Sequence, residues 1–174
     1  MTEYFDVIDE NDRVIGKASR DECHKRGLLH RAVHILILNG KGEMLLQKRS
    51  MKKDLYPGWW IDAASGHVGL GEDYDAAASR ELMEEIGVNT PLEYLLTVRK
   101  TWSGNGKIDD EIIHVYLGHS DGPFKINDDE VELVRFYDPK KVLEMIKNKK
   151  LTPATVKILE EIRKQPKLLR RLGL

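Results

Sequence analysis

The hydrophobic positions of this chain fall in short runs separated by glycine and polar turn residues, a pattern typical of strands. Residues 32–38 form an apolar, β-branched run that is short enough to be a buried strand. Residues 43–48 follow it across an Asn-Gly-Lys-Gly turn, which favours a hairpin. Residues 4–8 and 13–17 flank a Glu-Asn-Asp turn, and we expect them to form an N-terminal hairpin. Further strands are expected at residues 92–102, 111–117 and 131–137.

One helix is well marked near the middle of the chain. Asp73 is suited to the N-cap of a helix over residues 73–86, and Gly87 is suited to its C-terminal stop. Apolar residues recur every fourth position along it: Ala78, Leu82 and Ile86. Two more helices are expected, one over residues 140–148 and one that begins at Thr152, where a proline follows the cap.

Strands and helices that mix without strict alternation predict an α+β class, with a mixed sheet and helices on both faces. A length of 174 residues fits one domain, residues 1–174. The 28 Lys and Arg against 29 Asp and Glu leave a formal charge of −1. This balance excludes the strongly basic surface of a general nucleic-acid binder. The residues leave open whether the protein is a monomer or a homodimer.

Two further features bear on the compartment. The longest apolar stretch, residues 32–38, is far too short to span a membrane. The lone Cys23 has no partner for an internal disulfide, which fits a reducing compartment. We therefore expect a cytoplasmic protein that binds neither membranes nor nucleic acids.

Three carboxylates crowd one face of the central helix. Glu81 and Glu85 are four residues apart and Glu84 lies between them, so like charges repel at a spacing that slightly destabilises a helix. One interpretation is a solvated helix face that Arg80 partly compensates. The other is a site for a hard cation such as Mg²⁺, which prefers oxygen ligands. On either interpretation we expect Glu85 on the open face of the helix, without contacts to the core.

The spacing around these residues resembles the signature of the Nudix hydrolases. Five residues separate Gly66 from Glu72, seven separate Glu72 from Arg80, and the run Arg-Glu-Leu-Met-Glu-Glu-Ile-Gly-Val ends at Val88. The segment fits the signature at every fixed position, which makes the cation site the favoured interpretation.

The resemblance implies an α/β/α sandwich and a metal-dependent hydrolase. In it, Glu81, Glu84 and Glu85 would bind one or more Mg²⁺ ions, or Mn²⁺, assisted by the Gly66 carbonyl. The substrate would be a diphosphate joined to another group, with nucleoside diphosphate derivatives favoured. Glu81 or Glu84 would take the proton of the attacking water, and Arg80 would orient the glutamates by ion pairing.

Motifs outside this signature resemble the isopentenyl-diphosphate isomerase branch of the same superfamily. They run from about residue 4 to residue 137 and include Gly-Leu-Leu-His-Arg-Ala at residues 27–32, Leu-Leu-Gln-Lys-Arg at 45–49 and Ile-Asn-Asp-Asp-Glu-Val at 126–131. Each motif is weak alone, but their order and intervals match.

The second resemblance implies a further metal site and a grip on diphosphate. The metal ligands would be a set drawn from several segments: His30, His67, Asp109 and Glu111. Such a mixed set suits Mn²⁺, Zn²⁺ or Mg²⁺. His24 lies one residue out of register with the family spacing. Arg49 and Lys53 match the basic pair that binds diphosphate. The alternative is that these histidines and basic residues are structural.

One position departs from the isomerase pattern. Ser65 stands where the isomerases carry a catalytic cysteine, and a serine hydroxyl has no acidity comparable to a thiol. Because the glutamates of the hydrolase signature are intact, the sequence favours hydrolysis. An isomerase with an altered acid and a non-catalytic diphosphate-binding domain remain the alternatives.

Overall fold

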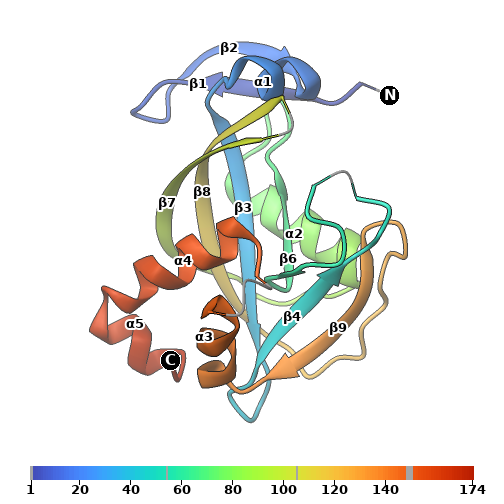
Figure 1. The fold of residues 1–174 in the computed structure, drawn as a ribbon, viewed down its shortest axis with the longest axis vertical. Helices are drawn as coiled ribbons and strands as arrows, with labels where there is room; N and C mark the ends of the chain where they lie inside the picture. The colour runs from blue at the N-terminus through green and yellow to red at the C-terminus, as the bar shows by residue number, and fades with distance from the viewer. Residues whose placement is uncertain (1, 54, 105, 148–150) are drawn as a thin grey trace.

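The computed structural model describes residues 2–53, 55–104, 106–147 and 151–174. A seven-stranded mixed sheet forms its centre, and helices cover both faces (Figure 1). The strands are β3 (His30–Leu38), β4 (Met44–Arg49), β5 (Trp60–Ile61), β6 (Ala64–His67), β7 (Glu93–Gly104), β8 (Lys107–His119) and β9 (Val131–Tyr137). Their order is β5-β4-β3-β8-β7, with β6 paired to β3 and β9 paired to β4. The expected α+β sandwich with a mixed sheet is confirmed.

The central strand β3 is buried on both sides, as its apolar run predicts. Leu36 and Leu38 pack in a core with α4 (Pro153–Arg163), while Val33 and Ile35 pack in a second core with α2 (Tyr74–Ile86). The helices α3 (Pro139–Lys147) and α5 (Pro166–Arg171) complete the α4 side. Because side chains alternate along a strand, β3 separates the two cores residue by residue.

The expected caps of α2 are confirmed. The Asp73 side chain accepts a hydrogen bond of 2.8 Å from the Ala76 amide, and Gly87 ends the helix with a positive φ of 68°. The sequence pattern missed four short elements: α1 (Arg20–Arg26), β5, β6 and α5. None of them is long enough to show an amphipathic period. Residue 148, the last of the helix expected over residues 140–148, lies outside the described residues.

The N-terminal hairpin of β1 (Tyr4–Ile8) and β2 (Val14–Ser19) forms, as expected, but as a separate two-stranded sheet. It lies with α1 over one end of β3 (Figure 1). Ser19 caps α1 by accepting from the Glu22 amide, and Gly27 closes the helix with a φ of 63°. This arrangement carries α1 to the end of β3 where His30 lies.

Two strands, β4 and β6, pair with the same side of β3. Residues 32–35 pair with β6, whereas Ile37 and Leu38 pair with β4. The two partners therefore leave β3 in different places and form a fork. The site described below opens at this fork.

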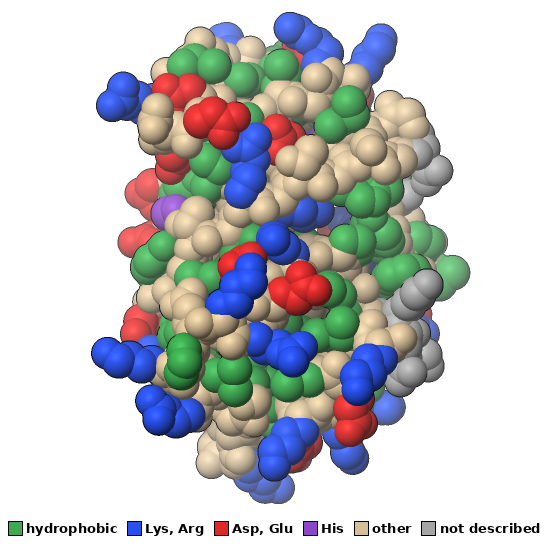
Figure 2. All heavy atoms as spheres, turned by 60° about the vertical axis from the view of Figure 1, so that its left-hand side comes forward, with side chains coloured by type: hydrophobic (Ala, Val, Ile, Leu, Met, Phe, Trp, Pro, Cys, Tyr) green, Lys and Arg blue, Asp and Glu red, His purple; other side chains and the backbone are tan. Residues whose placement is uncertain are grey.

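Two surface properties bear on partners. On the face shown in Figure 2, Lys and Arg side chains are interspersed with acidic and hydrophobic ones rather than gathered in one patch. Within the described residues, no helix combines the length and apolar character needed to cross a membrane.

Candidate active site

A cavity of about 390 Å³ opens at the fork, and most of the predicted site residues line it. Its walls come from β3, β6, α2, the paired strands β7 and β8, the segment after β4 and the N-terminus of α4. The structure thus gathers two groups of residues that are far apart in the sequence. One is the acidic face of α2, and the other is a histidine-rich cluster beside β8.

Glu81 lies against the backbone of β6. A Cβ atom added to Gly66 would come within 2.1 Å of the Glu81 carboxyl carbon, so only glycine leaves room for this carboxylate. Burial raises the pKa of Glu81, although Arg80 opposes the shift. The Glu81 carboxylate therefore lies against the backbone at Gly66, the residue whose carbonyl is predicted to assist it in binding a cation.

Glu85 does not lie on the open face, and that expectation is wrong. Its exposed fraction is 6%, and its Oε2 accepts from Gln47 Nε2 at 2.6 Å and from the Ser65 amide at 3.2 Å. Burial, together with the charge of Glu81, raises the pKa of Glu85 to about 8. The Glu85 side chain lies in the fork between β4 and β6. The pattern of the helix alone cannot predict this contact. Glu84, by contrast, is 57% exposed.

Arg80 ties the acidic face together. Its guanidinium donates to Glu72 at 2.8 and 2.9 Å, to Glu81 at 2.6 Å and to Glu84 at 3.3 Å. It also donates to the His67 carbonyl at 3.1 Å. The hydrogen bonds that Arg80 donates to Glu72 and Glu81 outweigh its partial burial and raise the pKa of Arg80. The ion pairing expected between Arg80 and the glutamates is present.

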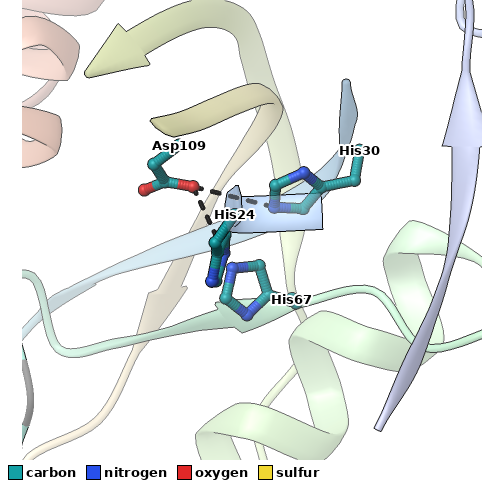
Figure 3. A group of neighbouring side chains, drawn as sticks. All are labelled: His24, His30, His67 and Asp109. Carbon is teal, nitrogen blue, oxygen red and sulfur yellow. Dashed lines mark ion pairs between the residues drawn. The ribbon is translucent and has the colours of Figure 1, made fainter. Parts of the chain in front are cut away.

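Three imidazoles and a carboxylate meet at the other end of the cavity (Figure 3). One ligand atom from each of His24, His30, His67 and Asp109 lies within 4.8 Å of the others. The Nε2 atoms of His24 and His30 are 3.6 and 3.7 Å from Asp109 Oδ1. His67 Nε2 is 3.4 Å from Glu111 Oε1. The helix α1 brings His24 into this group although its sequence spacing is one residue out of register.

The cluster has the properties of a metal site. His24 Nε2, His30 Nε2 and Asp109 Oδ1 are buried without a hydrogen-bond partner, an arrangement that costs free energy unless a ligand satisfies these atoms. His30 Nδ1 lies 2.8 Å from the Leu28 carbonyl, which directs Nε2 into the cluster. Burial lowers the pKa of His24 to about 4, so the ring is neutral and suited to bind a metal ion. These residues fit a divalent ion.

An aromatic ring of the N-terminal hairpin covers the cluster. Phe5 is fully buried, and its ring centroid lies 5.3 Å from that of His30 and 4.6 Å from that of His67, both stacked. The hairpin therefore shields the imidazoles from one side.

Lys100 is a site residue that the sequence pattern missed. It lies opposite Glu111 in the β7–β8 register, and its Nζ donates to Asp109 at 2.7 Å and to Glu111 at 3.1 Å. Burial opposes its charge, but the two carboxylates outweigh this effect and raise the pKa of Lys100. Only the register of β7 and β8, which is not legible in one sequence, places this lysine.

The predicted basic pair also lines the cavity. Arg49 Nε donates to the Leu55 carbonyl at 3.0 Å, and Lys53 Nζ donates to the Glu130 carboxylate. Their contact with a diphosphate stays a prediction. Two groups of candidate metal ligands and two basic side chains facing one cavity are suited to bind and polarise a phosphorylated ligand.

Comparison with known proteins places these residues in a family. The sequence model of the NUDIX domain matches residues 28–162. An isopentenyl-diphosphate Δ-isomerase 2 of Photorhabdus laumondii is 36% identical over 149 residues, which cover 85% of this chain and 84% of the relative. An uncharacterized Nudix hydrolase of Pseudomonas aeruginosa is 33% identical over 152 residues, which cover 87% and 88%.

A crystal structure from Deinococcus radiodurans has the same fold, with a TM-score of 0.78 at 21% identity. The match covers 91% of this chain and 98% of that one. The sequence relatives thus include both an isomerase and a hydrolase.

Proposed function

The chain belongs to the NUDIX domain family, and on that premise we propose that it is a metal-dependent hydrolase acting on a diphosphate linkage. The favoured substrate is a nucleoside diphosphate derivative or a related diphosphate compound. The observation that carries this proposal is the seating of Glu81 on Gly66, with Arg80 bound to Glu81 in the same cavity as Arg49 and Lys53.

Two groups of residues would bind the metal ions. Glu81, Glu84 and Glu85, with the Gly66 carbonyl, would hold Mg²⁺ or Mn²⁺. The cluster of His24, His30, His67, Asp109 and Glu111 would hold a further ion. Bound ions supply neutralisation of phosphate charge and a lower pKa for the attacking water.

The chain's own groups then move the proton and hold the ligand. As the water oxygen bonds to phosphorus and the bridging P–O bond breaks, Glu81 or Glu84 accepts the proton, and a monophosphate leaves. Arg80 keeps both carboxylates in place through its bonds of 2.6 and 3.3 Å. Arg49 and Lys53 would contact the phosphate oxygens, Arg49 through its planar fork and Lys53 as a point charge.

A panel of diphosphate compounds with Mg²⁺ and with Mn²⁺ tests the proposal. Phosphate or monophosphate release from one class of compound, abolished by EDTA and by Glu81→Gln, is the expected result. The exposed Glu132→Gln, which lies on β9 outside the cavity, is the control and should keep full turnover. Absence of release from every compound would overturn the proposal.

An isomerase acting on isopentenyl diphosphate is the second candidate, because the histidine cluster and one group of relatives point to it. Against it stands Ser65 in place of the cysteine. Incubation with Mg²⁺ and isopentenyl diphosphate separates the two by product, since the hydrolase releases phosphate and the isomerase forms dimethylallyl diphosphate. Isomerisation that appears only in Ser65→Cys would show that residue 65 separates the activities.

We propose that residues 1–174 form a single domain and that the protein works in a reducing compartment such as the cytoplasm. The lone and buried Cys23 supports that compartment.

A further inference from the structure

A buried acid–base pair lies beside the same cavity, outside both proposed metal sites, and one of its members, His34, lines the cavity. His34 Nδ1 lies 2.5 Å from Asp62 Oδ2, and the two side chains are 6% and 1% exposed. His34 belongs to β3, on the same side of the strand as His30, and Asp62 follows β5 directly. The sequence pattern does not reveal this pair, because His34 lies within an apolar run.

The contact with Asp62 fixes the direction of the imidazole. With Nδ1 engaged, Nε2 points away from Asp62, and no hydrogen bond to Nε2 is found among the described residues. Unlike Nε2 of His24 and His30, this atom is not sealed inside the protein, and His34 lines the cavity. The ring therefore presents one nitrogen to whatever the cavity holds.

The buried carboxylate of Asp62 favours a hydrogen-bond donor beside it. Asp62 is fully buried, its Oδ1 has no partner among the described residues, and His34 is the group that faces its Oδ2. A buried carboxylate is destabilising unless a donor beside it satisfies its oxygens. Nδ1–H of His34 takes this role for Asp62, and the ring directs its other nitrogen, Nε2, into the cavity, where an imidazole with a proton on each nitrogen donates a second hydrogen bond.

A hydroxyl-bearing residue, Ser65, lies next to this donor. Ser65 is the register partner of His34 in the β3–β6 pair, so their side chains lie on the same face of the sheet. Ser65 also lines the cavity. An N–H donor with a hydroxyl beside it, and no protein acceptor for the N–H among the described residues, is suited to an anionic oxygen.

We propose that His34 Nε2 donates a hydrogen bond to a phosphate oxygen of the bound diphosphate, and that Asp62 is the positioning residue that orients the ring. This inference rests on the diphosphate chemistry proposed above and adds a specificity-determining contact to it. It also gives a role to the pair that faces Ser65, at the position where the isomerase pattern has its cysteine.

The direct test is NMR of the histidine side chains in the unaltered protein. Methylenediphosphonate, a diphosphate that cannot be hydrolysed, is added with and without Mg²⁺. The ¹⁵Nε2 signal of His34 should shift on saturation, while that of the exposed His119 should not. A low-field proton resonance from the Nδ1–H of His34 should be present, and Asp62→Asn should abolish it. Because this measurement needs no substitution at His34, it does not depend on a variant that folds.

Binding measurements complete the test. His34→Gln and Asp62→Asn should weaken methylenediphosphonate binding about tenfold or more, as expected for the loss of a charge-assisted hydrogen bond, whereas His119→Gln should bind like the parent. An unshifted His34 signal together with unchanged affinity overturns the inference, even if the enzyme hydrolyses diphosphates. A shifted signal in a protein that hydrolyses no member of the panel sustains the inference and overturns the proposed hydrolase.

Discussion

The Glu81 carboxylate occupies the space that a side chain at Gly66 would fill, since a Cβ there would lie 2.1 Å from its carboxyl carbon. Gly66→Ala should therefore displace Glu81 from the cavity and reduce metal-dependent turnover by about 100-fold or more. The overpacking should lower the free energy of unfolding by about 1–3 kcal/mol, which leaves the protein folded. Turnover and urea denaturation measure the two effects.

The control for this prediction is Gly16→Ala. A Cβ at Gly16 meets nothing within 4 Å, so this change should leave turnover at the parent level. If Gly66→Ala retained full activity, the contact between Glu81 and β6 would have no part in binding the ion.

The buried carboxyl of Glu85 should make stability depend on pH in the absence of metal. Its pKa of about 8 in the fold lies well above the value near 4.3 of an unfolded chain. The stabilising contribution of the neutral form is therefore complete below about pH 4.3 and is lost as pH rises through 8. Relative to Glu85→Gln, the parent in EDTA should have a melting temperature that falls between pH 5.5 and pH 8.

Glu84→Gln is the matched control for the pH prediction, because this side chain on the same helix is 57% exposed. It should leave the pH dependence of the parent intact. Both variants should fold, and Glu85→Gln should lose metal-dependent turnover. Parallel melting profiles for the parent and Glu85→Gln across this pH range would contradict the burial of a neutral Glu85.

The histidine cluster should bind a divalent ion separately from the acidic helix. Calorimetric titration with MnCl₂ should show one ion fewer in His67→Gln than in the parent, because one ligand of the cluster is gone. The melting temperature should also rise less on addition of Mn²⁺. His119→Gln, at an exposed position, should titrate like the parent. Equal stoichiometry in the parent and His67→Gln would remove this site.

Lys100 neutralises Asp109 and Glu111 when no metal is bound. Lys100→Met should lower the free energy of unfolding in EDTA by about 3–5 kcal/mol, because two buried carboxylates lose their counter-charge. Lys157→Met is the control: it breaks a pair with Glu161 in which the lysine is 41% exposed, and it should cost less than about 1 kcal/mol. Added Mn²⁺ should raise the free energy of unfolding of Lys100→Met by more than it raises that of the parent. A loss no greater than that of Lys157→Met would be contrary to this prediction.

The sequence predicts the acidic helix well because all its signals are local. The cap at Asp73, the stop at Gly87 and the spacing of the glutamates lie within one short segment, and each has a fixed physical meaning. The sequence wrongly predicts that Glu85 lies on the open face, because the burial of this side chain depends on the fork between β4 and β6. That fork forms from strand pairings which no local pattern specifies.

The histidine cluster was predicted in part, for the same reason. Asp109 and Glu111 share a face of β8 by strand alternation alone. Whether His24 joins them depends on α1, a helix of seven residues that is too short to show a period. Lys100 and His34 were missed because each acquires its role from a partner on another strand. Long-range register, rather than residue type, sets the limit of the prediction.

The Phe5 ring stacked on two of the imidazoles, and His24 on α1, both precede residue 28, where the match to the family begins. A fragment trimmed to the family boundaries would thus keep every glutamate of α2. It would lack His24, one of the candidate ligands of the histidine cluster, and the Phe5 ring that covers the cluster. Chimeras that graft residues 28–162 onto another protein should inherit one ion site and forfeit the other.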